Sequence, residues 1–79
     1  MAAGLADLAR REETLPALLV SIGAPRLRLL GLAVPEPFDA PETRLYRLLA
    51  SENADAAHGR YNALVRTLVS FERALSRAA

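Results

Sequence analysis

The sequence predicts an all-α protein, built as a single helical domain over residues 1–79. Three observations support this prediction. Apolar residues in the last third of the chain recur alternately four and three residues apart, a period of 3.5 that is typical of a helix packed along a coiled-coil seam. Alanine and leucine, both good helix formers, dominate the composition. The few helix-breaking residues fall in clusters, so they separate helices rather than interrupt them.

The N-terminal third predicts two helices. The first is expected over residues 2–13. Thr14 and Pro16 then indicate a new helix start, because threonine accepts hydrogen bonds from free backbone N–H groups and proline is tolerated in a first turn. The second helix is expected over residues 15–22, and it is apolar on nearly all sides, which indicates burial.

The segment Gly23-Ala24-Pro25 predicts the end of the second helix, since glycine just past a helix and proline soon after it are common stop signals. A short third helix is expected over residues 26–33. Its alternation of arginine and leucine would also suit a strand, but no other segment of the chain is rich enough in β-forming residues to pair with it.

Three prolines within seven residues predict a loop over residues 34–40. Asp39 and Glu42 are placed to cap the helix that follows. One long C-terminal helix is expected over residues 41–78. The alternative is a kink or break near residues 51–55, because the apolar stripe changes side there and the segment is polar.

The apolar stripe of the last helix needs a cover, and the short N-terminal helices look too short to provide all of it. A chain of this size gains little stability from its own core, and it contains no cysteine and a single histidine, so disulfides and a structural zinc site are excluded. We therefore predict a helical bundle that is assembled by oligomerisation. The predicted interface with a second copy or another helical partner consists of Ala54, Ala57, Tyr61, Leu64, Val65, Leu68, Phe71 and Leu75.

Charge gives nucleic acid little support as a partner. The net charge is only +1, whereas dedicated nucleic-acid binders are usually clearly basic. Arg66, Arg73 and Arg77 nevertheless share the outer face of the last helix and form a predicted basic ridge. This ridge could contact phosphate groups or an acidic protein, or it could simply be a solvated face.

The residues predict no enzyme, metal site or cofactor. The acidic residues are scattered, the serines lack a nucleophile motif, and no glycine-rich phosphate loop is present. His58 and Tyr61 lie one turn apart, and they leave a pocket between subunits as a third option for function.

We expect a small non-enzymatic assembly protein that self-associates through its C-terminal helix. A phage-type DNA-packaging or structural subunit, of bacterial or phage origin, is the architectural analogy. The alternative is a partner-binding module that presents an apolar helix face to another protein, such as a secretion or flagellar-type chaperone or a small regulator. No apolar run of about 18 residues and no secretory signal are present, so we expect no membrane contact and a cytoplasmic location.

Overall fold

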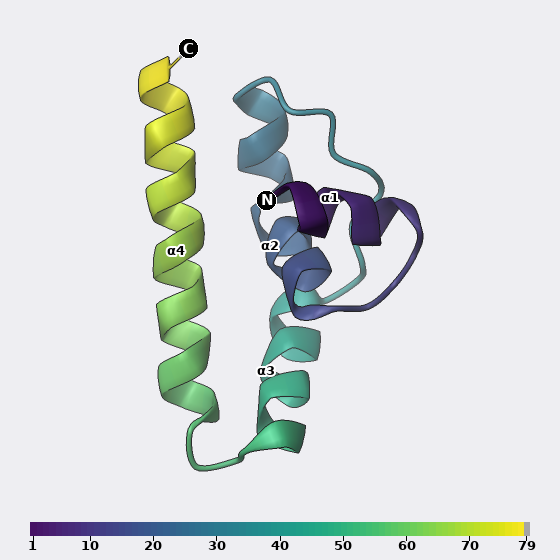
Figure 1. Cartoon of the computed structure of the whole chain (residues 1–79), viewed down its shortest axis with the longest axis vertical. Helices are drawn as coiled ribbons and strands as arrows, with labels where there is room; N and C mark the ends of the chain where they lie inside the picture. Colours follow the sequence, from purple (N-terminus) through teal and green to yellow (C-terminus); the bar gives the residue numbers. More distant parts are fainter. Residues whose placement is uncertain (79) are drawn as a thin grey trace.

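A computed structural model of the chain describes residues 1–78, which form four helices and no strand (Figure 1). The predicted all-helical class is therefore confirmed. The helices are α1 (Ala2–Ala9), α2 (Leu15–Leu29), α3 (Pro41–Glu52) and α4 (Ala57–Ala78). Helices α2 and α4 run in the same direction, α3 runs the opposite way, and α1 lies across α2 (Figure 1). Within residues 1–78, every helix is too short or too polar to cross a membrane.

The helix predicted over residues 2–13 ends earlier, at Ala9. Its end is closed by a hydrogen bond from the Glu12 N–H to the Asp7 carbonyl (2.9 Å), which needs a left-handed residue just before it. Arg11 takes that conformation, with φ 60°. The chain therefore turns away from the helix axis before the predicted end.

Helix α2 begins as the sequence predicts. The Thr14 hydroxyl accepts from the Ala17 N–H (3.2 Å) and donates to the Asp7 carboxylate (2.8 Å), so it both caps α2 and ties α2 to α1. The two helices cross at Gly4, where an added Cβ would lie only 2.6 Å from the Pro16 carbonyl oxygen. The close approach of the backbones explains why a glycine stands inside α1.

The helices predicted over residues 15–22 and 26–33 are instead one helix, α2, with Pro25 in its interior. An interior proline removes a backbone hydrogen bond and usually costs about 3 kcal/mol or more. Ala24, directly before Pro25, and Leu27, two residues after it, are fully buried. We infer that their burial outweighs the cost of the proline and carries the helix through the predicted break.

Gly23 is a packing residue rather than a stop signal. A Cβ at this position would lie 2.8 Å from the Leu68 Cδ1 atom, so glycine lets α2 approach α4. The stop signal is Gly31, which has φ 98°. The Leu32 N–H then donates to the Leu27 carbonyl (3.0 Å), closing the helix end around that glycine.

Helix α3 begins at Pro41, as predicted, but the predicted cap by Asp39 is wrong. The residue at the cap position is Ala40, which is left-handed (φ 45°) and makes no side-chain cap hydrogen bond. Asp39 contributes its backbone instead, because its carbonyl accepts from the Arg44 Nε–H (2.6 Å). Glu42 lies in the first turn, where a negative charge favours the helix N-terminus.

The single helix expected over residues 41–78 is two helices, so the structure takes the alternative of a break. After Glu52 the Asn53 side chain accepts hydrogen bonds from the N–H groups of Asp55 (3.1 Å) and Ala56 (3.2 Å). This local bonding stabilises a turn in place of a further helical turn. The chain then reverses, which brings the apolar stripes before and after the break to the same core.

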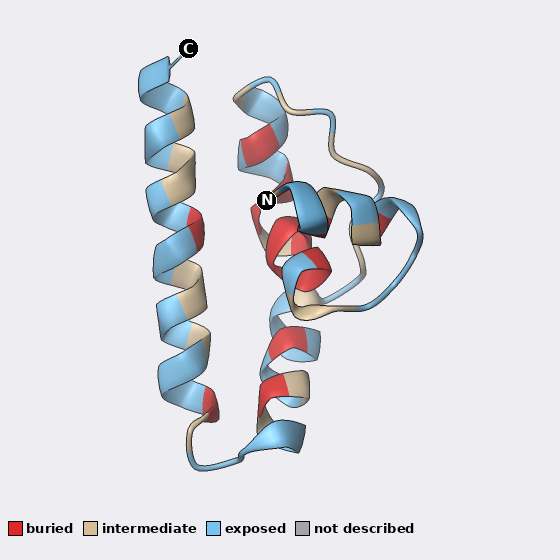
Figure 2. Cartoon of the chain, in the orientation of Figure 1, coloured by how far each residue is buried: buried red, intermediate tan, exposed pale blue. Residues whose placement is uncertain are grey.

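The core lies between α2, α3 and α4, with α1 closing one side (Figure 2). Each helix contributes its inward face, while the outer faces of α3 and α4 are exposed. The largest fully buried side chains are Leu8, Leu18, Val20, Leu27, Leu45 and Leu49.

Candidate interaction surface

Helix α4 turns most of its predicted interface residues toward the chain's own core. Ala57 and Leu68 are buried, and Ala54 is exposed in the turn before the helix. The other five are partly buried: Tyr61, Leu64, Val65, Phe71 and Leu75. The residues of the stripe therefore share one side of α4, as their period indicates, and the centre of this side faces the core of the same chain.

Two helices of the same chain cover this stripe. Helix α2 contacts it where Gly23 meets Leu68. Helix α3 contacts it where the rings of Tyr46 and Tyr61 lie 5.8 Å apart between centres. Leu64, Phe71 and Leu75 also pack against the core.

Within one chain, α2 and α3 therefore cover the centre of the stripe, while several of its residues stay partly exposed. Assembly by oligomerisation remains a prediction. The chain exposes 4810 Å² of surface. A folded monomer of its mass, 8.5 kDa, exposes about 4,700 Å². The physical reason for this cover is the reversal after Glu52, which shortens the last helix and folds it back along α3 and α2.

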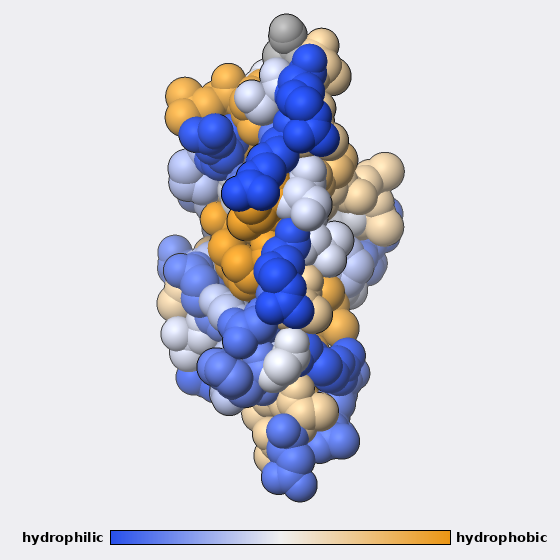
Figure 3. All heavy atoms as spheres, turned by 90° about the vertical axis from the view of Figure 1, so that its left-hand side faces the viewer, coloured by the Kyte–Doolittle hydropathy of each residue, from blue (hydrophilic) through white to orange (hydrophobic). Residues whose placement is uncertain are grey.

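The flank of the stripe remains outside the core. Val65 and Val69 are the large apolar residues of α4 that do not pack against the core cluster, and Val69 is 36% exposed. In the view facing α4, hydrophobic side chains are visible beside a column of strongly hydrophilic ones (Figure 3). An apolar strip thus lies next to charged residues on the outer side of the molecule.

The predicted basic ridge is present on α4. Arg66, Arg73 and Arg77 are exposed. At about 100° per residue they fall within an arc of about 40°, on the side of the helix opposite Leu68. Within residues 1–78 their guanidinium groups make no hydrogen bond or ion pair. The ridge is therefore free to bind an external anionic group.

Arginines elsewhere in the chain mostly bind groups of the chain itself, and nothing in their sequence spacing indicates these partners. Arg28 donates to the carbonyls of Val34 (3.0 Å) and Pro35 (3.1 Å), so α2 anchors the loop that follows it. Arg44 of α3 pairs with the Glu13 carboxylate at 2.6 Å. The other engaged arginines are Arg10, which pairs with Asp7 and Glu12, Arg11, which donates to the Glu36 carbonyl, and Arg60, which pairs with Glu52.

The Phe38 ring, in the loop between α2 and α3, lies close to two of these arginines, Arg11 and Arg44. The Arg11 guanidinium lies 4.5 Å from the centre of the Phe38 ring, and that of Arg44 lies 6.0 Å from it. The Phe38 N–H donates to the Ser21 hydroxyl (3.2 Å), which fixes the loop to α2. The contacts join residues far apart in the sequence, and no spacing rule could have revealed them.

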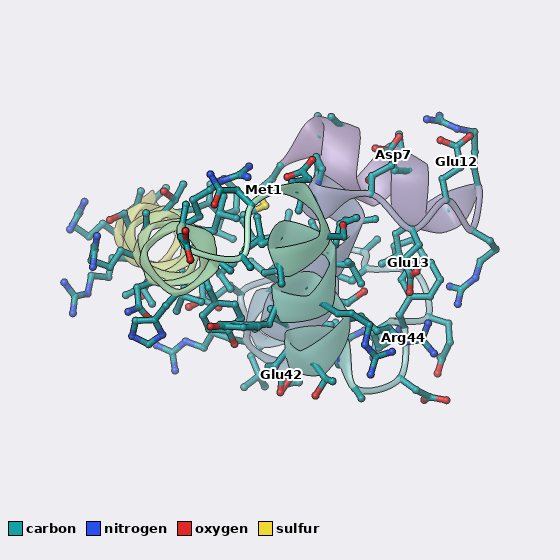
Figure 4. All side chains as sticks on the ribbon, turned by 90° about the horizontal axis from the view of Figure 1, so that it is seen from below. Met1, Asp7, Glu12, Glu13, Glu42 and Arg44 are labelled. Carbon is teal, nitrogen blue, oxygen red and sulfur yellow. The ribbon has the colours of Figure 1, made fainter. Side chains whose placement is uncertain are left out.

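Six of the nine acidic residues lie before residue 45, whereas Glu52 pairs with Arg60 of α4, Asp55 is in the turn before α4 and Glu72 is on α4. Asp7, Glu12 and Glu13 lie on the side remote from α4 when the molecule is seen from below (Figure 4). Within the described part of the chain, Glu36, Asp39 and Glu42 are exposed and form no ion pair. We call these last three residues the acidic rim. The rim follows the loop between α2 and α3 into the first turn of α3, whereas α4 forms the opposite edge in Figure 1.

An apolar groove of about 420 Å³ opens where α1, α2 and α4 meet. Its lining carries no titratable side chain, and the Thr67 hydroxyl donates to the Ala63 carbonyl (3.1 Å). The groove is suited to apolar contact rather than to acid–base chemistry. It is lined by Met1, Ala3, Gly4, Leu15, Pro16, Leu19, Leu64 and Thr67.

The pair singled out for chemistry does not form a joint site in one subunit. His58 is exposed, and its Nε2 atom lies 3.3 Å from the Asn62 side-chain nitrogen. Tyr61 packs instead against Tyr46 of α3. The two side chains therefore point to different surroundings.

Comparison of the chain with protein-family models, with curated proteins and with solved structures finds no match.

Proposed function

We propose that this protein is a small non-enzymatic assembly protein whose folded subunits associate with one another through the outer side of α4. The observation that carries the proposal is the unused surface of this helix. Val65 and Val69 are apolar and lie outside the core, beside three arginines without a partner in residues 1–78. Apolar residues next to free charges are typical of a protein contact surface.

The proposed contact differs from the interface predicted by the apolar stripe. Leu68 lies at the centre of that stripe and is buried in the subunit itself. Folded subunits would therefore meet at the flank of the stripe, and we expect a reversible association rather than an obligate oligomer with a shared core.

The test is sedimentation velocity on a variant that carries Val65→Gln and Val69→Gln. Glutamine keeps helix propensity and adds no charge, so the fold and the net charge are preserved. We expect weaker association with an unchanged circular-dichroism spectrum. A control with Ala6→Gln and Ala9→Gln changes two exposed residues of α1, away from α4, and should associate as the wild type does. If the valine variant self-associates as strongly as the wild type and the control do, the proposed surface is refuted.

A second candidate function is favoured by the apolar groove. Because its lining is uncharged and comes from three helices, it fits the apolar side chains of a helix from a different protein. In that case the purified protein would stay monomeric, and Ala3→Gln or Thr67→Gln, at exposed positions of the lining, would reduce partner binding, whereas the valine pair would not.

A further inference from the structure

The charges of this chain are separated in space. Helix α4 carries four arginines and one glutamate, whereas the rest of the chain carries six arginines and eight acidic residues. Helix α4 therefore has a net charge of +3 and the rest of the chain a net charge of −2, which together give the total of +1. The basic ridge holds three of the arginines that form no ion pair, and the acidic rim holds three of the carboxylates that form none; Arg26, Arg47, Asp55 and Glu72 also form none within residues 1–78.

Resting on the self-association proposed above, we propose that the ligand of the basic ridge is the acidic rim of a second copy of this chain. The ridge offers three unpaired guanidinium groups and the rim offers three unpaired carboxylates. Guanidinium and carboxylate groups form charge-assisted hydrogen bonds, often two at a time. The numbers of free partners therefore match.

The lengths of the two surfaces are compatible. From Arg66 to Arg77 the ridge extends about 16 Å, at 1.5 Å per residue of helix. From Glu36 to Glu42 the chain can span at most about 20 Å. A rim from one copy can thus lie along the ridge of the next, with several charge pairs formed together.

Apolar residues accompany both surfaces. The carboxylates of the rim recur every three residues and are separated by Pro37, Phe38, Ala40 and Pro41. The ridge is flanked by Val65 and Val69. A contact that pairs the charges would also cover part of this apolar surface, which a nucleic-acid backbone would not do.

Repulsion between arginines of the ridge also favours an acidic partner. Arg73 and Arg77 are four residues apart on the same helix, and like charges at this spacing disfavour each other. No acidic side chain of residues 1–78 forms an ion pair with either arginine. Carboxylates from a second copy would relieve it. Nucleic acid is the weaker candidate, because the acidic remainder of the chain would repel phosphate groups.

The positions of the two surfaces determine the kind of assembly. The ridge lies on one edge of the molecule and the rim follows another side (Figure 1), so a ridge-to-rim contact joins two different surfaces and leaves one of each free for a further copy. Head-to-tail contacts of this type continue from copy to copy and produce rings or open chains. We therefore expect species larger than a dimer as the protein concentration rises.

The experiment is sedimentation velocity at about 20 mM and about 500 mM salt, since screening at the higher salt weakens exposed charge pairs. The ridge variant carries Arg66→Glu and Arg73→Glu, and the rim variant carries Glu36→Arg and Glu42→Arg. The control carries Arg26→Glu and Arg47→Glu, two exposed arginines without an ion pair, so its net charge equals that of the ridge variant. Circular dichroism establishes that each variant is folded.

At low salt we expect the ridge and rim variants to associate with a Kd at least about tenfold higher than the wild type, and the control to stay within about twofold. An equimolar mixture of ridge and rim variants should restore association, because each then meets the opposite charge. At high salt the wild type should dissociate.

Three outcomes would overturn the inference, and they separate it from the proposed function. If the wild type associates but the ridge variant associates equally well, self-association stands and the ridge is not its contact. If the wild type is monomeric at both salt concentrations, both proposals fail. If the ridge variant loses affinity for a single-stranded DNA oligonucleotide while self-association persists, the ridge contacts nucleic acid instead.

Discussion

The first three helices and α4 use the same residue types in different ways. Before Asn53, four of the six arginine side chains bind loop carbonyls or carboxylates, and Gly4 sits at a helix crossing without room for a side chain. On α4, three of four arginines have no partner in residues 1–78, and Gly59 faces open space. The single polar link from α4 to the other described helices is the pair of Arg60 and Glu52.

This difference indicates a division of roles between the two regions. In the region before Asn53, many polar side chains bind the loops and the helix ends. Helix α4 is attached mainly through apolar contacts along one side, and its other side is unused by the fold. Changes on the inner side of α4 should therefore affect stability, and changes on its outer side should affect association.

The largest effect should come from charge placed on the inner side of α4. Leu68→Asp puts a carboxylate into a site that is 3% exposed, which removes apolar burial and leaves the charge without a partner. We expect a loss of more than about 3 kcal/mol of unfolding free energy, enough to unfold a domain of this size. Val69→Asp, one residue on and 36% exposed, should melt close to the wild type. Thermal melts followed by circular dichroism compare them, and equal melting would contradict the inward orientation of the stripe.

The next largest effect should come from Gly4→Ala. The new Cβ would lie 2.6 Å from the Pro16 carbonyl oxygen and 2.7 Å from the Val20 Cγ2 atom, so α1 would have to shift. We expect a loss of about 1–3 kcal/mol, as for other overpacked sites. Urea denaturation measures it. A variant as stable as the wild type would mean that α1 is not held closely against α2.

The same substitution at the glycine of α4, Gly59→Ala, should raise the free energy of unfolding instead of lowering it. Gly59 lies inside the helix, and an added Cβ would meet nothing within 4 Å. Gly59→Ala should therefore stabilise the protein by about 0.5–1 kcal/mol, because alanine loses less backbone freedom on folding. The same urea titration serves as the readout. Destabilisation by this change would show that the start of α4 is covered by something in the folded state.

The smallest effect on stability should come from replacing an arginine that forms an ion pair, compared with one that forms none. Arg44→Gln removes the pair with Glu13 and the hydrogen bond to the Asp39 carbonyl, and both groups are exposed, so we expect a loss of about 0.2–1 kcal/mol. Arg66→Gln removes no contact within the described residues and should stay within about 0.5 kcal/mol of the wild type. Differences in melting temperature between the two variants provide the measurement. A larger loss for Arg66 would reveal a structural role for the ridge.

Local signals in the sequence predicted the helix starts well. Thr14 and Pro41 lie where the helices begin, because caps and first-turn prolines act within a few residues. The helix end at Gly23 was mispredicted because a glycine serves equally as a stop signal and as a gap for a neighbouring helix. The period alone does not reveal that the neighbour is Leu68.

The candidate surface was predicted only in part. Helical spacing places Arg66, Arg73 and Arg77 on one face, and the structure shows them there. The same spacing could not reveal whether the stripe is covered by the chain itself, because that depends on the reversal at Asn53. Likewise, the arginines that bind loop carbonyls reach partners up to 25 residues away along the chain, as Arg11 does.

The most direct measurement of the central claim is sedimentation equilibrium of the wild-type protein at about 20 mM and about 500 mM salt. A folded subunit with an unused contact surface on α4 predicts a mass above 8.5 kDa that rises with concentration at low salt. At high salt the same sample should give 8.5 kDa with an unchanged helical spectrum. A mass of 8.5 kDa under both conditions at all concentrations would contradict the account and leave α4 without a second copy as its partner.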